Sequence, residues 1–206
     1  MYMICFFKQP CLFVYSQKTM NKKLPVILPE IAFIGRSNAG KSSLINALLF
    51  QKNLVRIGKT PGSTMSVNYF NLGNKVILVD LPGFGYARRA KNKVLQISGL
   101  MKHYLCCNKH LSLLVVLIDV RRGLNYFLYI FIRSLVNKGT NIVVVFNKID
   151  VVTEATLLCT KHQTYIYSQE IYNNICYISC KYNIGLDKLR QLILNFIHLD
   201  KHNLYK

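Results

Sequence analysis

Acidic residues are scarce in this sequence: eight Asp and Glu stand against 27 Lys and Arg among 206 residues, a formal charge of +19. The deficit is uneven, because residues 1–118 carry a net charge of +14 and residues 119–206 only +5. Hydrophobic residues make up 51% of the chain, which excludes a wholly disordered basic protein. A folded chain with this charge indicates a polyanionic partner, bound mainly through residues 1–118.

Long apolar runs are also lacking. The longest, around Leu113–Ile118, falls far short of the ~18 residues that a spanning helix needs, so we expect no stable membrane insertion. The apolar start, Met1–Tyr15, is interrupted by Lys8 and Pro10 and has neither a basic leader nor a small-residue cleavage site. We therefore expect no signal peptide.

The cysteines lack the spacing of a structural site. There are seven, an odd number, and no pair has the C-x-x-C spacing. His103, Cys106, Cys107 and His110 suggest a metal cluster, but adjacent cysteines diverge on a helix, and buried free thiols are the simpler interpretation. Free thiols indicate a reducing compartment, which predicts a cytoplasmic protein.

Strand-like and helix-like segments alternate from Leu24 onward. Strands are predicted over Glu30–Ile34, Ser66–Leu72, Val76–Asp80, Leu111–Asp119, Ile142–Phe146 and Ile175–Ser179, and helices over Ser42–Phe50, Ala90–Cys107, Leu124–Leu135 and Leu186–Leu199. This alternation predicts an α/β fold with a mixed, mostly parallel six-stranded sheet and helices on both faces. We expect residues 1–23 to be an N-terminal extension that is either disordered or, if translation starts at Met20, not translated. Residues 24–200 would form the domain, and residues 201–206 would be a basic tail.

The segment Gly35–Ser42 reads G-R-S-N-A-G-K-S, directly after a predicted strand and before a helix. The two glycines let the backbone N–H groups point at phosphate oxygens, aided by the helix dipole. Lys41 would reach the β- and γ-phosphates, and the Ser42 hydroxyl would ligate Mg²⁺. This motif predicts a nucleoside triphosphate but does not select the base.

Three further motifs follow predicted strands. Asp80–Gly83 is D-x-x-G, in which the carboxylate can hold Mg²⁺ through water and the last N–H can sense the γ-phosphate. In Asn147–Asp150, Asn147 would contact guanine N7, and the Asp150 carboxylate can accept from N1–H and N2–H₂, a donor pair that adenine lacks. Backbone N–H groups of Ser179–Lys181 could reach guanine O6. Four such motifs in order are typical of a Ras-like P-loop GTPase with GTP/GDP and Mg²⁺.

One motif of such a GTPase remains, the loop between the first predicted helix and the second predicted strand. It must supply a Thr that contacts Mg²⁺ and the γ-phosphate. Lys59–Thr64 offers two candidates. Thr60 precedes a proline and should be extended, whereas Thr64 follows a glycine that permits a sharp turn. We prefer Thr64.

The stretches GRSNAGKSSLIN (Gly35–Asn46), KTPGST (Lys59–Thr64) and DLPGFGYA (Asp80–Ala87) resemble the bacterial EngB family, also called YsxC or YihA. The resemblance implies a monomeric GTPase that acts in assembly of the large ribosomal subunit and is needed for normal division and septation. By the same resemblance the nucleotide contacts Gly35, Arg36, Ser37, Asn38, Ala39, Gly40, Lys41, Ser42, Gly62, Ser63, Thr64, Met65, Ser66, Asp80, Leu81, Pro82, Gly83, Asn147, Lys148, Ile149, Asp150, Ile178, Ser179 and Cys180.

The resemblance to the EngB family also implies that Ser42 and Thr64 bind Mg²⁺ and that Asp80 holds the ion through water. It implies catalytic roles for Lys41, Thr64 and Gly83. The family usually carries Arg where Ser63 stands and Gln where Met65 stands, and the loss of that Arg removes one possible phosphate or RNA contact from the first switch.

The residue after D-x-x-G is Phe84, where Ras-type enzymes place a Gln that orients the attacking water. A phenyl ring cannot hydrogen-bond water, so we expect slow intrinsic hydrolysis, stimulated by a ribosomal partner or by K⁺. Asn38 stands where potassium-activated relatives place a cation-ligating Asn; the alternative is that it only stabilises its loop.

The segment Leu81–Ile118, which begins at the second switch, contains six Lys and Arg but no acid, with Tyr86 and Tyr104 between them. Phosphate contacts and base stacking would let it bind ribosomal RNA or a precursor of the large subunit. The alternatives are a solvated basic face, a nucleotide-gated RNA-binding module with negligible turnover, and a septal or membrane-surface GTPase.

Overall fold

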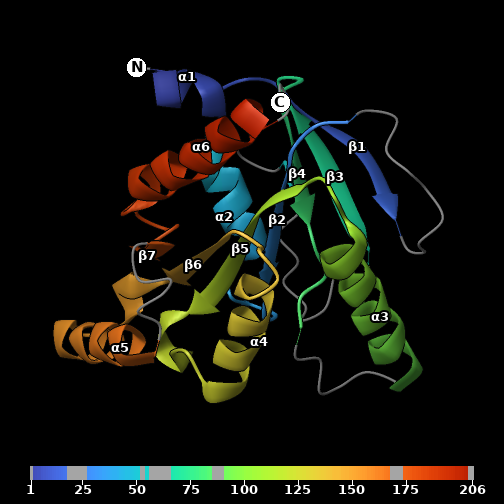
Figure 1. The fold of residues 1–206 in the computed structure, drawn as a ribbon. Coiled ribbons are helices and arrows are strands. Elements are labelled where there is room, and N and C mark those ends of the chain that lie inside the picture. Colours follow the sequence, from blue (N-terminus) through green and yellow to red (C-terminus); the bar gives the residue numbers. More distant parts are fainter. Residues whose placement is uncertain are drawn as a thin grey trace.

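The computed structural model describes residues 2–17, 27–51, 54–55, 66–84, 91–167 and 174–203. They form one sheet with helices on both faces (Figure 1). The strands are β1 (Cys11–Gln17), β2 (Glu30–Gly35), β3 (Val67–Leu72), β4 (Val76–Asp80), β5 (Leu111–Asp119), β6 (Ile142–Asn147) and β7 (Ile175–Ile178). The helices are α1 (Tyr2–Phe7), α2 (Lys41–Leu48), α3 (Lys91–Cys107), α4 (Tyr126–Val136), α5 (Glu154–Tyr167) and α6 (Leu186–Asn203), with short 3₁₀ helices η1 (Val120–Arg122) and η2 (Ile149–Val151).

The strands lie in the order β1-β3-β4-β2-β5-β6-β7. β3 is antiparallel to both β1 and β4, and the remaining neighbours are parallel. The carboxyl ends of β2, β4, β5, β6 and β7 therefore meet at one edge of the sheet, where ligands of open α/β sheets bind.

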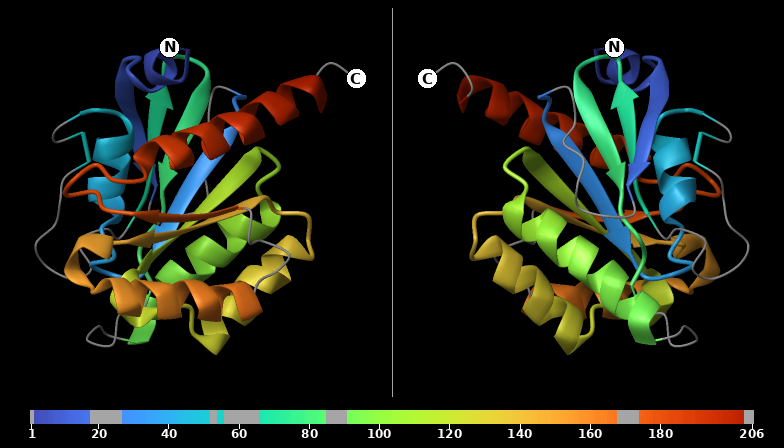
Figure 2. Two further views of the ribbon diagram at one scale, coloured as in Figure 1. Left: turned by 90° about the vertical axis from the view of Figure 1, so that its left-hand side faces the viewer. Right: turned by 90° about the vertical axis from the view of Figure 1, so that its right-hand side faces the viewer.

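Successive side chains of the central strand β2 enter two separate cores because strand side chains alternate between faces. Ile31 and Phe33 pack with residues of α1, α2 and α6, whereas Ala32 and Ile34 pack with residues of α3 and α4. Figure 2 shows the two layers of helices on either side of the sheet. This burial on both faces explains why the parallel strands read as continuous apolar runs.

The end of α2 is held by α6. Arg190 of α6 is buried, and its guanidinium donates to the carbonyl oxygens of Ala47 (2.7 Å) and Leu48 (3.1 Å). The same guanidinium lies 3.9 Å from the ring centroid of Phe50. These bonds add donors to the carbonyls at the end of the helix, and so they fix the helix that begins at Lys41.

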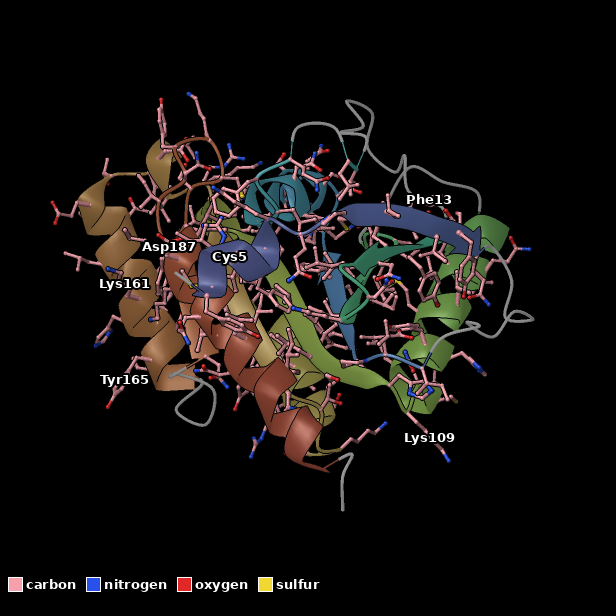
Figure 3. All side chains as sticks on the ribbon, turned by 90° about the horizontal axis from the view of Figure 1, so that it is seen from above. Cys5, Phe13, Lys109, Lys161, Tyr165 and Asp187 are labelled. Carbon is pink, nitrogen blue, oxygen red and sulfur yellow. The ribbon has the colours of Figure 1, made fainter. Side chains whose placement is uncertain are left out.

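All six predicted strands are present, but the sheet has seven, so the predicted strand number is wrong. The additional strand, β1, comes from the residues expected to form an extension and lies beside β3 at the sheet edge (Figure 3). In the register of the two strands, Cys11 lies opposite Leu72. Phe6 and Phe7 of α1 are buried in the core that contains α6. Part of the expected extension is therefore packed into the domain.

The seven cysteines are free thiols, but most are not buried. Cys106 and Cys107 are exposed on α3, so the prediction of buried thiols fails there, whereas Cys11 and Cys176 are buried. Across the described ranges, no group of three or more His, Cys, Asp and Glu could hold a metal ion. Within the same ranges, no helix is long and apolar enough to cross a membrane.

Candidate nucleotide-binding site

The phosphate-loop motif lies at the carboxyl end of β2, and the other motifs converge on it from neighbouring strand ends. Gly40 precedes α2 with φ of 97°, and a Cβ atom at this glycine would lie 2.5 Å from Nδ2 of Asn147. A Cβ at Gly35 would lie 2.7 Å from the carbonyl oxygen of Leu117. The two glycines thus allow both the left-handed turn and the close packing of the loop against β5 and β6.

Lys41 and Asp80 form a buried ion pair between the start of α2 and the end of β4. Asp80 accepts through Oδ1, and its Oδ2 is buried without a hydrogen-bond partner among the described residues. The Ser37 hydroxyl oxygen, in the phosphate loop, is likewise buried without a partner there. Buried polar atoms without partners are rare in native proteins and mark where a ligand, ion or water completes the site.

These groups fit a magnesium ion. Mg²⁺ keeps several waters and takes one or two carboxylates together with substrate phosphates. The open oxygen of Asp80 suits a bound water, and Ser42 stands next to Lys41 at the first turn of α2, where its hydroxyl can serve as a ligand. The donor set is therefore the oxygen-rich type that Mg²⁺ prefers.

Lys148 links two of the motifs. It lies in Asn147–Asp150, which we call the guanine motif, and it contacts the phosphate loop. Its ammonium donates to the carbonyl oxygen of Asn38 (2.6 Å) and to Oδ2 of Asp119 (3.0 Å), and its backbone is left-handed with φ of 69°. Asn147 makes a second link, since its Nδ2 donates to the carbonyl oxygen of Ala39 (2.9 Å). Contacts within the protein thus hold the loop and the guanine motif together.

Asp119 is a site residue that sequence reasoning did not single out. It ends β5 and accepts from Nε and Nη2 of Arg121 (2.8 and 2.5 Å) as well as from Lys148. Burial alone would raise the pKa of Asp119, but the bonds from Arg121 and Lys148 outweigh it and hold that pKa below its usual range. The sequence signal that could have identified Asp119 was its place at the end of a buried strand, between the motifs Asp80–Gly83 and Asn147–Asp150.

The motif Ser179–Lys181 lies beside Asn147 and Asp150, and together these residues form what we call the guanine side of the site. The Ser179 hydroxyl donates to Oδ1 of Asp150 (2.6 Å), and the Cys180 amide donates to Oδ1 of Asn147 (3.2 Å). Burial, with a smaller effect of the Asp150 charge, raises the pKa of the Cys180 thiol to about 12. Asp150 is therefore oriented as an acceptor, and the thiol beside it stays neutral.

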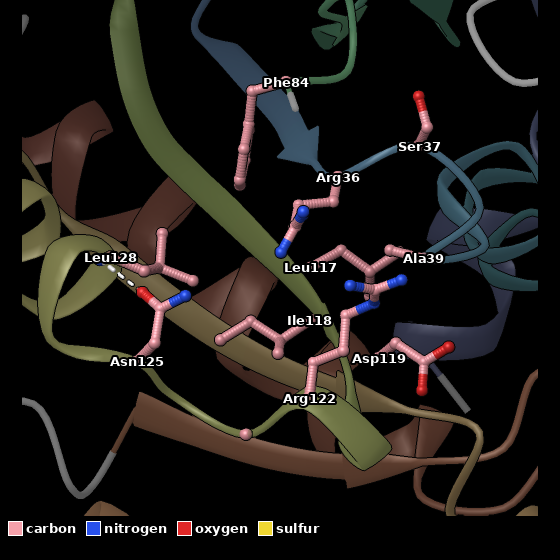
Figure 4. A pocket seen from close by; sticks show the side chains of 11 residues that line it. Arg36, Ser37, Ala39, Phe84, Leu117, Ile118, Asp119, Arg122, Asn125 and Leu128 are labelled. Atoms are coloured by element: carbon pink, nitrogen blue, oxygen red, sulfur yellow. Dashed lines mark hydrogen bonds between the residues drawn. The ribbon is translucent and has the colours of Figure 1, made fainter. Parts of the chain in front are cut away.

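Phe84 is bonded to the phosphate loop through its backbone. Its amide donates to the carbonyl oxygen of Gly35 (3.1 Å), and its carbonyl accepts from the amide of Ser37 (3.4 Å). The ring lies in a small pocket beside Arg36, Arg122 and other residues (Figure 4). The position after D-x-x-G thus carries an apolar side chain directed into the protein.

The structure brings together the predicted residues after β2, β4, β6 and β7. Gly62, Ser63, Thr64 and Met65, with the choice between Thr60 and Thr64, lie outside the described residues. Ser66 directly precedes β3, and its hydroxyl donates to Oδ1 of Asn68 (3.0 Å).

A family model described as "50S ribosome-binding GTPase" matches residues 30–148. The chain is 35% identical over 184 residues to a probable GTP-binding protein EngB of Rickettsia canadensis, covering 89% of this chain and 84% of that protein. It is 36% identical over 181 residues to a probable EngB of Rickettsia bellii, covering 87% of this chain and 85% of that protein.

A crystal structure of a probable GTP-binding protein EngB superposes with a TM-score of 0.66 at 26% identity, over 82% of this chain and 98% of that one. Aquifex aeolicus Era bound to GDP and aluminium fluoride superposes with the same TM-score at 23% identity, over 83% of this chain and 57% of Era. The second likeness concerns the fold alone.

Proposed function

Since the chain belongs to the EngB family of GTP-binding proteins, we propose that it binds GTP with Mg²⁺ at this site, hydrolyses it to GDP and phosphate, and uses the cycle as a switch in assembly of the large ribosomal subunit. The observation that carries the proposal is the convergence of the phosphate loop with Asp80, Lys148 and Asp150 at one sheet edge. Cytoplasmic location, a monomeric state and a role in division and septation remain predictions.

Guanine selection would rest on Asp150. Its carboxylate accepts two hydrogen bonds from N1–H and N2–H₂ while Ser179 holds Oδ1 in place. Asn147 would contact N7, and the aliphatic stem of Lys148 would cover the base. The Cys180 amide would face O6, for which it must give up its bond to Oδ1 of Asn147, whereas the Ser179 amide donates to the carbonyl oxygen of Ile184.

Phosphate binding would rest on the loop amides of Arg36–Gly40 and on Lys41. Ser42 and Thr64, with Asp80 acting through water, would hold Mg²⁺, which would neutralise charge on the β- and γ-phosphates. For Lys41 to reach these phosphates its ammonium must leave Asp80. The carboxylate is then free to accept from metal-bound water.

In the hydrolysis step, water attacks the γ-phosphorus and the bond to the β–γ bridging oxygen breaks, giving GDP and inorganic phosphate. Lys41 and the Gly83 amide would stabilise the charge on the transferring group. The side chain of Phe84 cannot orient water, so we expect slow turnover until a partner or K⁺ supplies the missing group. Asn38 is the candidate K⁺ ligand, and equal rates in K⁺ and Na⁺ buffers would remove it.

Partner binding would use the basic segment Leu81–Ile118, which begins at the D-x-x-G motif. The direct experiment is co-sedimentation with ribosomal subunits in GDP, GTP and a non-hydrolysable analogue, with turnover measured with and without 50S particles. We expect analogue-dependent binding to 50S and at least tenfold faster hydrolysis. Binding without stimulation would favour the nucleotide-gated RNA-binding module, and flotation with anionic liposomes in place of 50S binding would favour a membrane-surface GTPase.

A further inference from the structure

A second cavity lies between α3 and α4 and reaches the D-x-x-G motif at one end. It encloses about 450 Å³, within the range of sites that hold ligands. Its apolar lining comes from both helices and from Phe84: Ile97, Met101, Leu105, Phe131 and Leu135. Figure 2 shows these helices side by side on the same face of the sheet. We call this cavity the α3–α4 groove.

The rim of the groove is basic. Lys102 of α3 and Lys138, just after α4, line it and are exposed. No Asp or Glu occurs in residues 81–118 or 120–149, so neither wall offers an acid to pair with these lysines. An apolar floor under two lysines fits a ligand that carries aliphatic side chains and carboxylates together.

Nucleic acid fits this lining poorly. Bases stack on aromatic rings and guanidinium planes, whereas the floor is mainly aliphatic, with Met101 and Leu105 partly exposed in it. We propose that the α3–α4 groove binds an acidic, amphipathic segment of a partner protein, with its apolar side chains on the floor and its carboxylates against Lys102 and Lys138.

One end of the groove is formed by Gly83 and Phe84. The backbone of Phe84 is bonded to Gly35 and Ser37 of the phosphate loop, so a segment seated in the groove touches a residue that is fixed to the nucleotide site. Docking should therefore respond to the bound nucleotide. That response rests on the proposed function, whereas the preference for acidic segments does not.

Cys106 provides a reporter, because it lines the groove and its side chain is exposed, whereas its neighbour Cys107 is exposed but does not line the groove. The reporter protein carries Cys5→Ser, Cys107→Ser and Cys159→Ser. The matched control carries Cys106→Ser in place of Cys107→Ser. Each is equilibrated, under competing 2-mercaptoethanol, with two disulfide-activated peptides, acetyl-Cys-Leu-Glu-Leu-Leu-Glu-amide and the same peptide with Lys for Glu.

We expect the Glu peptide to modify Cys106 at least tenfold more than the Lys peptide, and the preference at Cys107 to be less than threefold. In the reporter protein, Lys102→Glu combined with Lys138→Glu should reverse the preference for the Glu peptide. Lys109→Glu combined with Lys188→Glu changes the net charge by the same amount and should leave that preference unchanged. Equal modification by the two peptides, or the same preference at Cys107, would overturn the proposal. So would loss of peptide selectivity combined with protection of Cys106 by a 12-nucleotide RNA, which would assign the groove to RNA.

Repeating the assay in GDP and in a non-hydrolysable GTP analogue separates the two claims. We expect the yield of the Glu peptide at Cys106 to differ at least threefold between the nucleotides. If the protein binds neither nucleotide, the proposed function fails while the charge preference persists. If both bind and the yields are equal, the link between the groove and the nucleotide site is wrong.

Discussion

The guanine side and the phosphate side of the site differ in how their polar groups are satisfied. On the guanine side, Lys148 is held by Asp119 and by the Asn38 carbonyl, and Asp150 is held by Ser179. All of these bonds are made within the protein. The groups that we propose to read the base are therefore oriented by their protein partners, which lowers the cost of ordering them on binding.

On the phosphate side the polar groups are incompletely satisfied. Lys41 and Asp80 neutralise each other, while Oδ2 of Asp80 and the Ser37 hydroxyl have no partner among the described residues. A ligand must separate the ion pair before either member can act. The comparison indicates that Lys148 and Asp150 find their partners within the protein, whereas Asp80 and Ser37 keep polar atoms that a ligand or ion can complete.

The largest expected effect breaks the phosphate side alone. Lys41→Ala should weaken GTP binding by about 100-fold, because two charge-assisted hydrogen bonds to phosphate are lost. Binding of guanosine, which has no phosphate, should change less than threefold. Calorimetry on Lys109→Ala, an exposed lysine elsewhere, provides the control. An equal loss for guanosine would contradict the division into two sides.

Asp150→Asn tests the guanine side. An amide cannot accept from both N1–H and N2–H₂ of guanine, so GDP affinity should fall by about 10- to 100-fold. Xanthosine diphosphate, whose O2 accepts from the new amide, should gain relative to GDP. Glu154→Gln, an exposed change nearby in sequence, should alter neither affinity. Loss of both nucleotides would mean that Asp150 supports the fold rather than reads the base.

Asp119→Asn sharpens the comparison, because Asp119 acts through Lys148. We expect about three- to tenfold weaker binding of GDP and GTP alike, and little further loss when the change is added to Lys148→Ala. Glu154→Gln, on the exposed surface of α5, is the matched control. Additive losses would show that Asp119 does not position Lys148.

The pairing of Asp119 also has a consequence for stability. Because its native pKa is lowered, its ion pairs stabilise the fold above the unfolded pKa of about 3.9 and are lost as pH falls through the native value. The stability difference between wild type and Asp119→Asn in urea should therefore shrink below about pH 4. A difference that grows with acid would contradict the pairing.

Glu30 lies outside both sides and should give the smallest effect on nucleotide binding. It is buried and accepts from Tyr104 (2.6 Å) and Asn108 (2.7 Å), and burial raises its pKa. Because the folded state holds this proton more tightly, stability falls as pH rises from about 4.3 through the raised pKa. Glu30→Gln should remove that fall, measured by urea unfolding at pH values above about 4.3, and change GDP affinity less than twofold. A larger change in affinity would extend the site to the far end of β2.

The sequence predicts the parts of the fold whose pattern is local. The buried parallel strands read as continuous apolar runs, and all six predicted strands are present. β1 escaped prediction because it lies at the sheet edge with Leu12 and Phe13 exposed, so its apolar residues mark no buried face. The helix Glu154–Tyr167 escaped as well, since its inner face carries Thr160 and Thr164 rather than an apolar stripe.

The candidate site divides in the same way, into features that have a local sequence pattern and features that depend on the fold. Lys41, Asp80 and Asp150 could be singled out as candidates because the spacing of each motif, and its place after a predicted strand, are local features of the sequence. The contacts that bring these motifs together could not be, because they join residues far apart in the chain, such as Asn147 and Ala39 or Lys148 and Asp119. A lone Asp at the end of a strand becomes informative only when the fold brings Lys148 to it.

The most direct test of the account is a pair of crystal structures, one of the nucleotide-free protein and one with Mg²⁺ and a non-hydrolysable GTP analogue. We predict that Lys148 keeps its bonds to Asp119 and to the Asn38 carbonyl in both, while Lys41 leaves Asp80 for the phosphates and Asp80 turns to metal-bound water. Rearrangement of the Lys148 bonds with an unbroken Lys41–Asp80 pair would contradict the account.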